Sequence, residues 1–540
     1  MSPPGRPKGE CRSAQHEGSQ MTHVEPSSPT TVRELIERQA ATRPEAIYAL
    51  ATEVAARITY GDLAHGCRAV AALLRRHGVG RGDTVSMVMP NGLQTIRLLL
   101  GVMHAGVCVN PVNLLAQPAQ MRYVLEHSDC SLVFVAPDWE ERVRAHIASL
   151  QRPVDVIVVD PDGSTLETAA SDPRGTTSNL AAEGDDGPPP ASDSIALLMY
   201  TSGTTGVPKG VMLTQANLAC NAAAISAEHA LTETDRVLAV LPLYHINAFA
   251  VTMLAPLAHG GSLALPARFS AARFWSQAAS TRCTWLNVVP TMISYLLEGP
   301  VPRREETARL RFCRSASAAL PPEHLRAFEE RFGIDVIETM GLTETVAPSF
   351  SNPPARGARK TGSVGRASGC EARVIDRAFA TVADGVTGEL AIRGPNVMRG
   401  YYKNDDATRA SFTPDGWLRT GDLGHRDADG FFFVTGRIKE LIIKGGENIA
   451  PREIDEALLS HPAVLEAAAV GMPDRHYGQD ILACVVLRAG CSCDETELRE
   501  FCLRQLGAYK TPKVFRFVAE LPRGPSGKVQ RLKLLDAPAS

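Results

Sequence analysis

Residues 200–210 read Tyr-Thr-Ser-Gly-Thr-Thr-Gly-Val-Pro-Lys-Gly, and the rest of the chain is organised around this stretch. Glycine lets the backbone turn sharply and approach a ligand closely. Backbone amides, short hydroxyls and one cation are together what a polyphosphate binds. The stretch therefore predicts a phosphate-binding loop. It supplies four small hydroxyl side chains, three glycines and one lysine: Thr201, Ser202, Thr204, Thr205, Gly203, Gly206, Gly210 and Lys209.

The flanks of this loop favour an ordered site. An apolar run at 195–199 predicts a buried strand before the loop, and residues 215–224 predict a helix after it. A flexible linker has a similar composition, but linkers seldom follow a buried strand directly. The P-loop pattern fails, because Pro208 stands five residues after Gly203 and Gly210 follows Lys209. We expect a strand, a loop and a helix that hold phosphate in another class of nucleotide enzyme.

Length and charge exclude several classes of protein. The chain has 540 residues, of which 44% are hydrophobic, and a formal net charge of -3. The length predicts about two to four structural units. The charge gives no basic surface, so we expect no nucleic acid as a partner. No apolar run reaches the roughly 18 residues of a membrane span.

The number and spacing of the cysteines indicate the cellular compartment of the protein. All twelve are scattered singly, except that Cys491 and Cys493 form a C-x-C pair. Such a pair is a weak metal signal when no further ligands stand near it in the sequence. Most of the cysteines are expected to be buried, reduced thiols. Since no apolar signal region opens the chain, we predict a cytoplasmic protein.

Periodicity divides the chain into domains. Residues 1–30 are rich in Pro, Ser and Gly and predict a disordered tail. From 32 to 135 helical and strand patterns alternate, which predicts an α/β fold of stacked βαβ units with largely parallel sheets. Residues 362–402 predict a small β subdomain, and the last hundred or so residues predict an α+β module. We place the boundary at Lys439, giving domains 31–438 and 439–540.

Further motifs follow the loop in a fixed order. They are Leu241-Pro-Leu-Tyr-His245, Met340-Gly-Leu-Thr-Glu344, Gly388-Glu-Leu, Thr420-Gly-Asp422, Gly436-Arg437-x-Lys439 and Ser526-Gly-Lys528. Together with the loop, they resemble the AMP-forming adenylating superfamily of acyl- and aryl-CoA ligases, peptide-synthetase adenylation domains and luciferases. The resemblance covers about residues 30–535. It implies a large N-terminal domain and a small, mobile C-terminal domain.

The resemblance implies a two-step reaction with ATP, Mg²⁺ and coenzyme A. A carboxylate attacks the α-phosphate of ATP to give an acyl-adenylate and pyrophosphate, and a thiol then displaces AMP. It assigns the β- and γ-phosphates to Thr201, Ser202, Gly203, Thr204, Thr205 and Lys209. It makes Glu344 a Mg²⁺ ligand, together with Thr204, and a hard cation does prefer such oxygens.

The remaining nucleotide contacts come from the same resemblance. Thr343 would contact the α-phosphate, Asp422 the ribose hydroxyls and Arg437 the ribose or phosphate. Lys528 would stabilise charge at the α-phosphate as the transition state forms. The adenine side would consist of Ser315, Ala316, Met340 and Gly341, with Met340 replacing the family's usual tyrosine. Lys439 matches the hinge position, and Lys444, Gly445 and Gly446 would face the site during thioester formation.

The acid pocket has two possible characters. Arg314-Ser-Ala-Ser-Ala318 followed by Ser351-Asn-Pro353 resembles oxalate–CoA ligases and bacterial acyl-CoA synthetases. A second anionic group on the substrate, as in a small dicarboxylate or a sulfo-acid, would need a cation such as Arg314. An ordinary structural salt bridge of Arg314 is an equal alternative. The other polar candidates are His245, Asn247, Ser315 and Ser317, while Val288, Val289 and Met292 suit an apolar acyl chain.

We conclude that the sequence predicts an AMP-forming carboxylate–CoA ligase for a short acid. His245 is placed in the active site as a gate between the acyl pocket and the thiol tunnel. Loading of a carrier protein, a medium- or long-chain fatty acid substrate, a luciferase-like oxygenase and a non-catalytic nucleotide-binding regulator are the alternatives. No carrier domain follows Lys528 before Ser540, which favours free CoA. A homodimer is left open.

Overall fold

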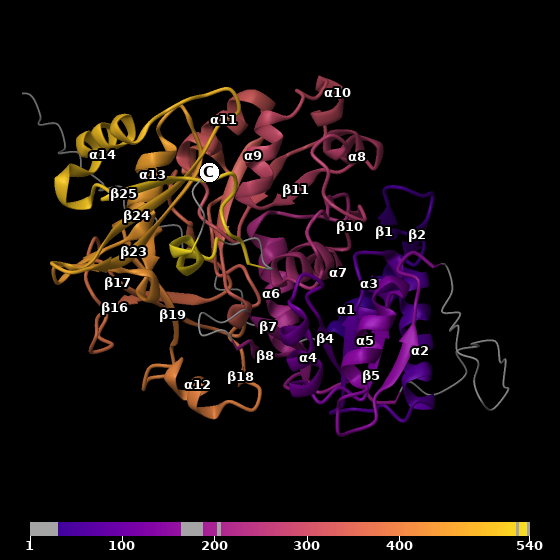
Figure 1. The fold of residues 1–540 in the computed structure, drawn as a ribbon. Coiled ribbons are helices and arrows are strands. Elements are labelled where there is room, and N and C mark those ends of the chain that lie inside the picture. The colour runs from indigo at the N-terminus through magenta and orange to yellow at the C-terminus, as the bar shows by residue number, and fades with distance from the viewer. Residues whose placement is uncertain (1–30, 164–186, 202–206, 525–528, 537–540) are drawn as a thin grey trace, which may run out of the picture.

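The computed structural model describes residues 31–163, 187–201, 207–524 and 529–536. They form two large mixed sheets, a small antiparallel sheet and a separate C-terminal sheet (Figure 1). The predicted α/β class, with a large N-terminal part and a smaller C-terminal part, is therefore confirmed. Ser202, Gly203, Thr204, Thr205 and Lys528, and the predicted tail 1–30, lie outside the described residues.

The phosphate-loop strand belongs to a seven-stranded sheet. Its strand order is β18-β8-β7-β4-β3-β5-β6, and the pairs from β7 to β6 are all parallel. β8 pairs antiparallel with both β7 and β18. The strands are β3 (Thr84–Val88), β4 (Cys108–Pro111), β5 (Leu132–Val135), β6 (Asp155–Val158), β7 (Ile195–Thr201), β8 (Lys209–Thr214) and β18 (Gly400–Tyr401).

β8 corrects the predicted strand–loop–helix unit. Residues 202–206 connect two antiparallel strands, and the helix begins only after the second strand, at Gln215. Thr214 caps that helix by accepting a hydrogen bond from the amide of Asn217. The loop therefore does not lead into a helix N-terminus. Its lysine, Lys209, stands on the returning strand opposite Thr201.

Helices pack beside this sheet through small residues. Gly101 of α3 lies so close to α2 that an added Cβ would come within 2.7 Å of Val70 Cβ. This contact explains why α3 tolerates glycine in its interior, where the residue normally costs about 1 kcal/mol. The helices of this part are α1 (Val32–Thr42), α2 (Tyr60–Arg76), α3 (Leu93–His104), α4 (Pro118–His127), α5 (Glu140–Ile147) and α6 (Gln215–Glu228).

The second large sheet has nine strands in the order β15-β14-β13-β12-β11-β9-β10-β1-β2. Its centre is parallel, and both edges are antiparallel. The strands are β1 (Ile47–Ala51), β2 (Arg57–Thr59), β9 (Arg236–Leu238), β10 (Ser262–Leu265), β11 (Trp285–Val288), β12 (Phe312–Ser315), β13 (Asp335–Met340), β14 (Phe350–Ser351) and β15 (Arg366–Ala367).

The helices of this half include an irregular one. Residues Asn247–Leu254 form the π-helix η2, which continues into α7 (Ala255–His259). π-Helical segments occur frequently at functional sites. The other helices here are α8 (Phe274–Ser280), α9 (Pro290–Glu298), α10 (Arg304–Thr307) and α11 (Pro322–Phe332), and the short 3₁₀ turns are η1 (Pro137–Trp139), η3 (Thr343–Thr345) and η4 (Arg356–Ala358).

The predicted β subdomain, 362–402, supplies two strands of a four-stranded antiparallel sheet, β16-β17-β19-β20, which continues to Arg437, whereas Gly400–Tyr401 joins the seven-stranded sheet. The inner face of the four-stranded sheet contributes Val374, Leu390 and Phe432 to one apolar cluster with Phe350 of β14. The small sheet is thereby fixed to the edge of the nine-stranded sheet. Its elements are β16 (Glu371–Ile375), β17 (Gly388–Arg393), β19 (Leu418–Arg426) and β20 (Phe432–Arg437), with α12 (Asp405–Ala410) between β18 and β19.

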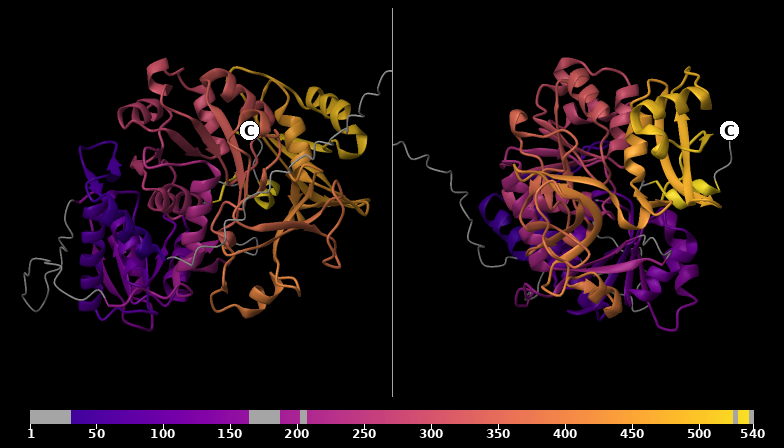
Figure 2. Two further views of the ribbon diagram at one scale, coloured as in Figure 1. Left: turned by 180° about the vertical axis from the view of Figure 1, so that it is seen from behind. Right: turned by 90° about the vertical axis from the view of Figure 1, so that its left-hand side faces the viewer.

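The C-terminal part has its own sheet and apolar core. It packs beside the nine-stranded half and the small β sheet, at the opposite end of the molecule from α2 and β2 (Figures 1 and 2). The predicted boundary, Lys439, falls in the 3₁₀ turn η5 (Ile438–Glu440) that joins the two parts. The elements are β21 (Ile442–Lys444), β22 (Glu447–Ile449), α13 (Pro451–Leu459), β23 (Val464–Asp474), β24 (Gly478–Leu487), α14 (Glu495–Lys510), β25 (Val514–Phe517) and η6 (Arg531–Leu535).

Candidate active site

The predicted phosphate side of the site lies on the paired strands β7 and β8. Thr201 ends β7 and pairs in register with Lys209 at the start of β8. The ammonium of Lys209 lies 4.6 Å from the ring centroid of Tyr401. The Tyr401 hydroxyl in turn donates a hydrogen bond of 2.8 Å to Glu344 Oε1. The structure thus joins two predicted residues, Lys209 and Glu344, through a tyrosine that sequence reasoning missed.

Glu344 has the donor chemistry that Mg²⁺ prefers. It lies in η3, directly after β13, with its side chain partly exposed. Its backbone oxygen accepts a hydrogen bond of 2.8 Å from the amide of Met398. Gly341 allows this turn, because an added Cβ would come within 2.7 Å of Ala347 Cα. A partly exposed carboxylate with only Oε1 engaged in the Tyr401 hydrogen bond fits a hard cation.

The two residues predicted for the ribose side form a cross-strand ion pair. Asp422 on β19 and Arg437 on β20 are register partners, and Arg437 Nε donates to Asp422 Oδ1 at 2.7 Å. Asp422 is only 3% exposed. The negative charge of Asp422 is the main reason that the pKa of Arg437 is raised, and Glu344 contributes in the same direction. Two predicted residues, Asp422 and Glu344, therefore act on a third, Arg437.

The predicted adenine side lies where β12 and β13 end. Ser315 is the last residue of β12, and Ala316 follows it; both are buried, whereas Ser317 is half-buried. Met340 ends β13, pairs with Phe350 and packs against the apolar cluster of the small β sheet. The two strands are neighbours, so these residues face the same edge of the sheet. Open α/β sheets bind ligands at such an edge.

Arg314 lies beside this edge and is completely buried. Its Nη1 donates to two amide oxygens, Asn247 Oδ1 at 2.7 Å and Asn287 Oδ1 at 2.8 Å. Asn247 Nδ2 donates in turn to Ser317 Oγ at 3.2 Å, and Ser317 has a left-handed backbone with φ of 76°. The structure therefore brings three predicted pocket residues together and adds Asn287, which the sequence analysis missed.

The structural salt bridge considered for Arg314 is not present among the described residues. In that part of the chain its Nε and Nη2 have no hydrogen-bond partner. Burial lowers the pKa of the Arg314 guanidinium to about 9, so the group still carries its charge at pH 7. The same charge helps to lower the pKa of His229 to about 3, although burial is the larger cause there.

The other acid-side candidates are less tightly grouped. His245 precedes η2, and its ring makes an edge contact with Tyr244, with centroids 4.8 Å apart. Val289 is the N-cap of α9 and packs partly buried against the main core. The gate role of His245 and the apolar wall at Val289 stay predictions.

The C-terminal part contributes two segments near the candidate site, one around Arg523 and one at 439–446. Arg523 pairs with Val529 in an antiparallel bridge and donates to Thr291 Oγ1 of α9 at 3.4 Å. Lys439 is exposed in η5. Lys444 is held within the C-terminal part by Asp480 at 2.7 Å and by the backbone oxygen of Tyr509 at 3.1 Å, next to the exposed Gly445 and Gly446.

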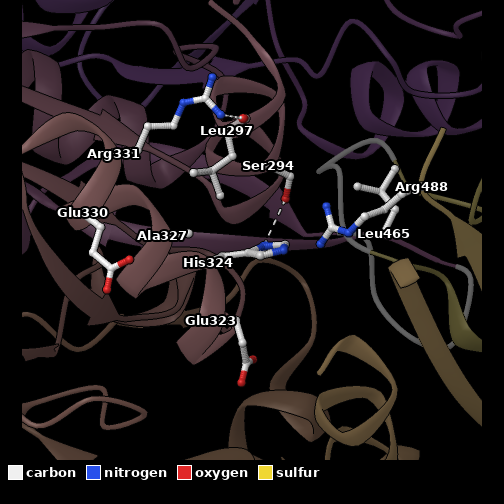
Figure 3. Close-up of a pocket in the computed structure, with 9 residues that line it drawn as sticks. All are labelled: Ser294, Leu297, Glu323, His324, Ala327, Glu330, Arg331, Leu465 and Arg488. Atoms are coloured by element: carbon white, nitrogen blue, oxygen red, sulfur yellow. Dashed lines mark hydrogen bonds between the residues drawn. The ribbon is translucent and has the colours of Figure 1, made fainter. Parts of the chain in front are cut away.

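A cavity of about 500 Å³ opens at the junction of the two parts (Figure 3). None of the predicted site residues lines it. His324 of α11 contacts Ser294 of α9 at 3.3 Å, and Arg488 approaches from the C-terminal part. Burial first, and the charge of Arg488 second, lower the pKa of His324. The cavity belongs to the interface between the parts and lies apart from the nucleotide residues.

The fold and these residues define an adenylate-forming enzyme, and comparisons specify its family. The profile of the family described as AMP-binding enzyme matches residues 36–402, and that of its C-terminal domain matches residues 453–528. The chain therefore belongs to the AMP-binding enzyme family, and it is an AMP-forming carboxylate–CoA ligase that uses ATP.

Relatives and a solved structure agree with this assignment. A sulfoacetate–CoA ligase of Cupriavidus necator is 58% identical over 513 residues, which cover 95% of this chain and 99% of the relative. An oxalate–CoA ligase of Arabidopsis thaliana is 36% identical, with 86% and 90% covered. ATP-bound MatB of Rhodopseudomonas palustris has a TM-score of 0.85 at 30% identity, with 94% and 99% covered. The predicted oxalate–CoA ligase branch is thus confirmed. Among the described residues, no helix is both long and apolar enough to span a membrane.

Proposed function

We propose that the acid activated by this ligase is short and carries a second anionic group, with sulfoacetate as the first candidate. The observation that carries the proposal is the buried, charged Arg314, which has no carboxylate partner among the described residues. The similarity to a sulfoacetate–CoA ligase and to oxalate–CoA ligases supports the same substrate class.

The physical reason is the cost of a buried charge. Moving an ion out of water costs several kcal/mol of free energy, unless an opposite charge or several hydrogen bonds compensate that cost. Two amide oxygens compensate the Arg314 guanidinium only in part. A sulfonate or second carboxylate in the pocket would supply the missing charge. Asn247 links the guanidinium to the half-buried Ser317, so we propose that the anion binds on the Ser317 side.

The same residues suggest how the reaction is divided among the parts of the site. The substrate carboxylate oxygen forms a bond to the α-phosphorus while the bond to the pyrophosphate oxygen breaks. We assign to Lys209 the neutralisation of the leaving pyrophosphate, and Glu344 would hold the Mg²⁺ that accompanies ATP; their common contact with Tyr401 supports this assignment. Asp422, positioned by Arg437, is suited to accept hydrogen bonds from both ribose hydroxyls.

The second step requires the C-terminal part. The CoA thiolate attacks the acyl carbon, and AMP leaves with the bonding electron pair. We assign Lys528 to the first step and the segment Lys444 to Gly446 to the second, with rotation about Lys439 between them. The position of Lys439 supports this hinge, because it lies exposed in the short turn η5 that joins the two parts.

Two further proposals concern the setting of the enzyme. The described cysteines are all free thiols, which suits the reducing cytoplasm. A homodimer remains a prediction.

A substrate screen tests the proposed acid. Pyrophosphate release is measured with sulfoacetate, oxalate, malonate, acetate and decanoate, and AMP formation is measured with and without CoA. We expect the highest kcat/KM among the acids with two negative charges. A preference for acetate or decanoate would contradict the role given to Arg314, and no CoA-dependent AMP with any of these acids would contradict the proposed substrate class.

A further inference from the structure

Three side chains of types that can bind a metal ion lie close together in the C-terminal part, away from the residues assigned to the nucleotide. His461 follows the last turn of α13, Cys493 precedes α14, and Glu497 lies in the first turn of α14. One ligand atom from each lies within 4.8 Å of the others. Of the C-x-C pair, only Cys493 belongs to this group; Glu497 follows it by four residues, and His461 comes from a distant part of the sequence.

We propose that His461, Cys493 and Glu497 bind one Zn²⁺ ion, with water as the fourth ligand. A thiolate, an imidazole and a carboxylate are all zinc ligands, and the thiolate disfavours the hard cations Mg²⁺ and Ca²⁺. His461 is buried and the Glu497 side chain is 58% exposed, so the ion would lie at the surface with one position open to solvent.

The distances are close to those of a metal site. Zinc bonds of normal length place neighbouring ligand atoms about 3.3–3.8 Å apart in a tetrahedron. His461 Nε2 and Glu497 Oε1 are already 3.5 Å apart. Cys493 has to move by roughly 1 Å, which a side-chain rotation provides. Asp494 caps α14 by accepting a 2.8 Å hydrogen bond from the Glu497 amide, so the backbone at Glu497 is fixed.

Zinc binding removes the thiol proton of Cys493 and changes the tautomer of His461. The thiol of Cys493 releases its proton to solvent as the sulfur–metal bond forms. Ligation through Nε2 of neutral His461 moves the remaining proton to Nδ1, which ends the weak 3.3 Å hydrogen bond that Nδ1 accepts from the Ala463 amide. The metal bond replaces that contact.

The expected role is structural. The ion would connect the end of α13 to the start of α14, two helices that pack on the same small core. In Figure 1, α14 lies at the outer edge of the C-terminal part. Zinc bound only by the folded chain raises its stability by mass action. It would therefore stiffen the domain that carries Lys528 without touching the reacting atoms.

Metal analysis of the full-length, untagged protein tests the proposal. After dialysis against Zn²⁺ and removal of free metal, we expect one zinc per chain in the wild type and near-complete loss in Cys493→Ser and His461→Gln. Cys491→Ser is the matched control, two residues from Cys493, and should keep its zinc. Added Zn²⁺ should raise the Tm of the wild type and of Cys491→Ser only.

Co²⁺ provides a readout that does not depend on stability. The wild type should show a near-ultraviolet thiolate-to-cobalt band, which Cys493→Ser should lack. The surface variant Glu497→Gln should bind Co²⁺ at least tenfold more weakly while releasing pyrophosphate normally. No bound zinc and no cobalt band in the wild type, or equal zinc in Cys493→Ser, would overturn the proposal. Neither result depends on which acid the enzyme activates.

Discussion

Replacing Arg314 by methionine removes a positive charge that is buried beside the proposed acid pocket. Methionine fills a similar space without a charge. If a sulfonate binds about 6 Å from the guanidinium, an effective dielectric constant of about 20 gives an attraction of roughly 3 kcal/mol. A loss of that size lowers kcat/KM for sulfoacetate by about 10²-fold.

The effect on folding should be smaller. Asn287 Oδ1 loses its donor, whereas Asn247 Oδ1 keeps a 3.4 Å hydrogen bond from Asn287 Nδ2. Each buried acceptor left without a partner costs about 1–3 kcal/mol. Removing a buried charge compensates part of this cost, because apolar replacements of buried ions are often neutral or stabilising. Arg314→Met should therefore fold, with a modestly lowered Tm.

Steady-state pyrophosphate release with sulfoacetate and with acetate separates the two effects. For acetate, which lacks the second charge, we expect kcat/KM to change less than about threefold. Arg314→Lys, which keeps the charge, should retain more sulfoacetate activity than Arg314→Met. The exposed Arg326 provides a control, since Arg326→Met should leave both acids unchanged. Equal losses for sulfoacetate and acetate in Arg314→Met would refute the reasoning, because they would indicate a general structural role.

Three other changes test the site and the fold. Tyr401→Phe removes the hydrogen bond to Glu344 but keeps the ring beside Lys209. A hydrogen bond to a charged group contributes about 1.5–3 kcal/mol, so kcat/KM for ATP should fall roughly 10- to 100-fold, and an unchanged value in an ATP titration would count against this contact. Lys439→Pro should slow thioester formation more than adenylation in single-turnover assays of each half-reaction, whereas equal slowing would remove Lys439 as the hinge. Burial raises the pKa of Glu338 to about 7 from 4.5, so its ionisation destabilises the folded state increasingly as pH rises from 4.5 to 7. Glu338→Gln should thus gain up to about 3 kcal/mol over the wild type in urea unfolding at pH 8, with little gain at pH 4.5, and an equal difference at both pH values would show that ionisation is not the cause.

Local patterns were sufficient for most of the fold. The alternation of apolar and polar residues identified α2, α3, β12 and β13, because each buries one face or one short run in the core. β8 was missed, since Lys209-Gly210 at its start is not typical of a strand and Gln215 begins a helix without an intervening turn. η2 was missed because an apolar run is equally compatible with α- and π-helical hydrogen bonding.

The candidate site was only partly predictable for a different reason. Family motifs identified Glu344, but its partner Tyr401 is 57 residues away and next to a second tyrosine, Tyr402. Likewise, Asn287 lies 27 residues from Arg314 on a neighbouring strand. Such contacts depend on the order of strands in the sheet, which one sequence without relatives does not specify.

The ion pair between Asp422 and Arg437 has a consequence for recombination between relatives. It joins two neighbouring strands immediately before the turn η5, so the last residue of the nucleotide site stands next to the first residue of the connector. A chimaera that exchanges C-terminal parts should therefore be joined after Arg437. A junction between Asp422 and Arg437 would combine an aspartate and an arginine from different parents across one pair of strands. A junction in the exposed turn η5 leaves that ion pair intact and transfers the C-terminal domain as one unit.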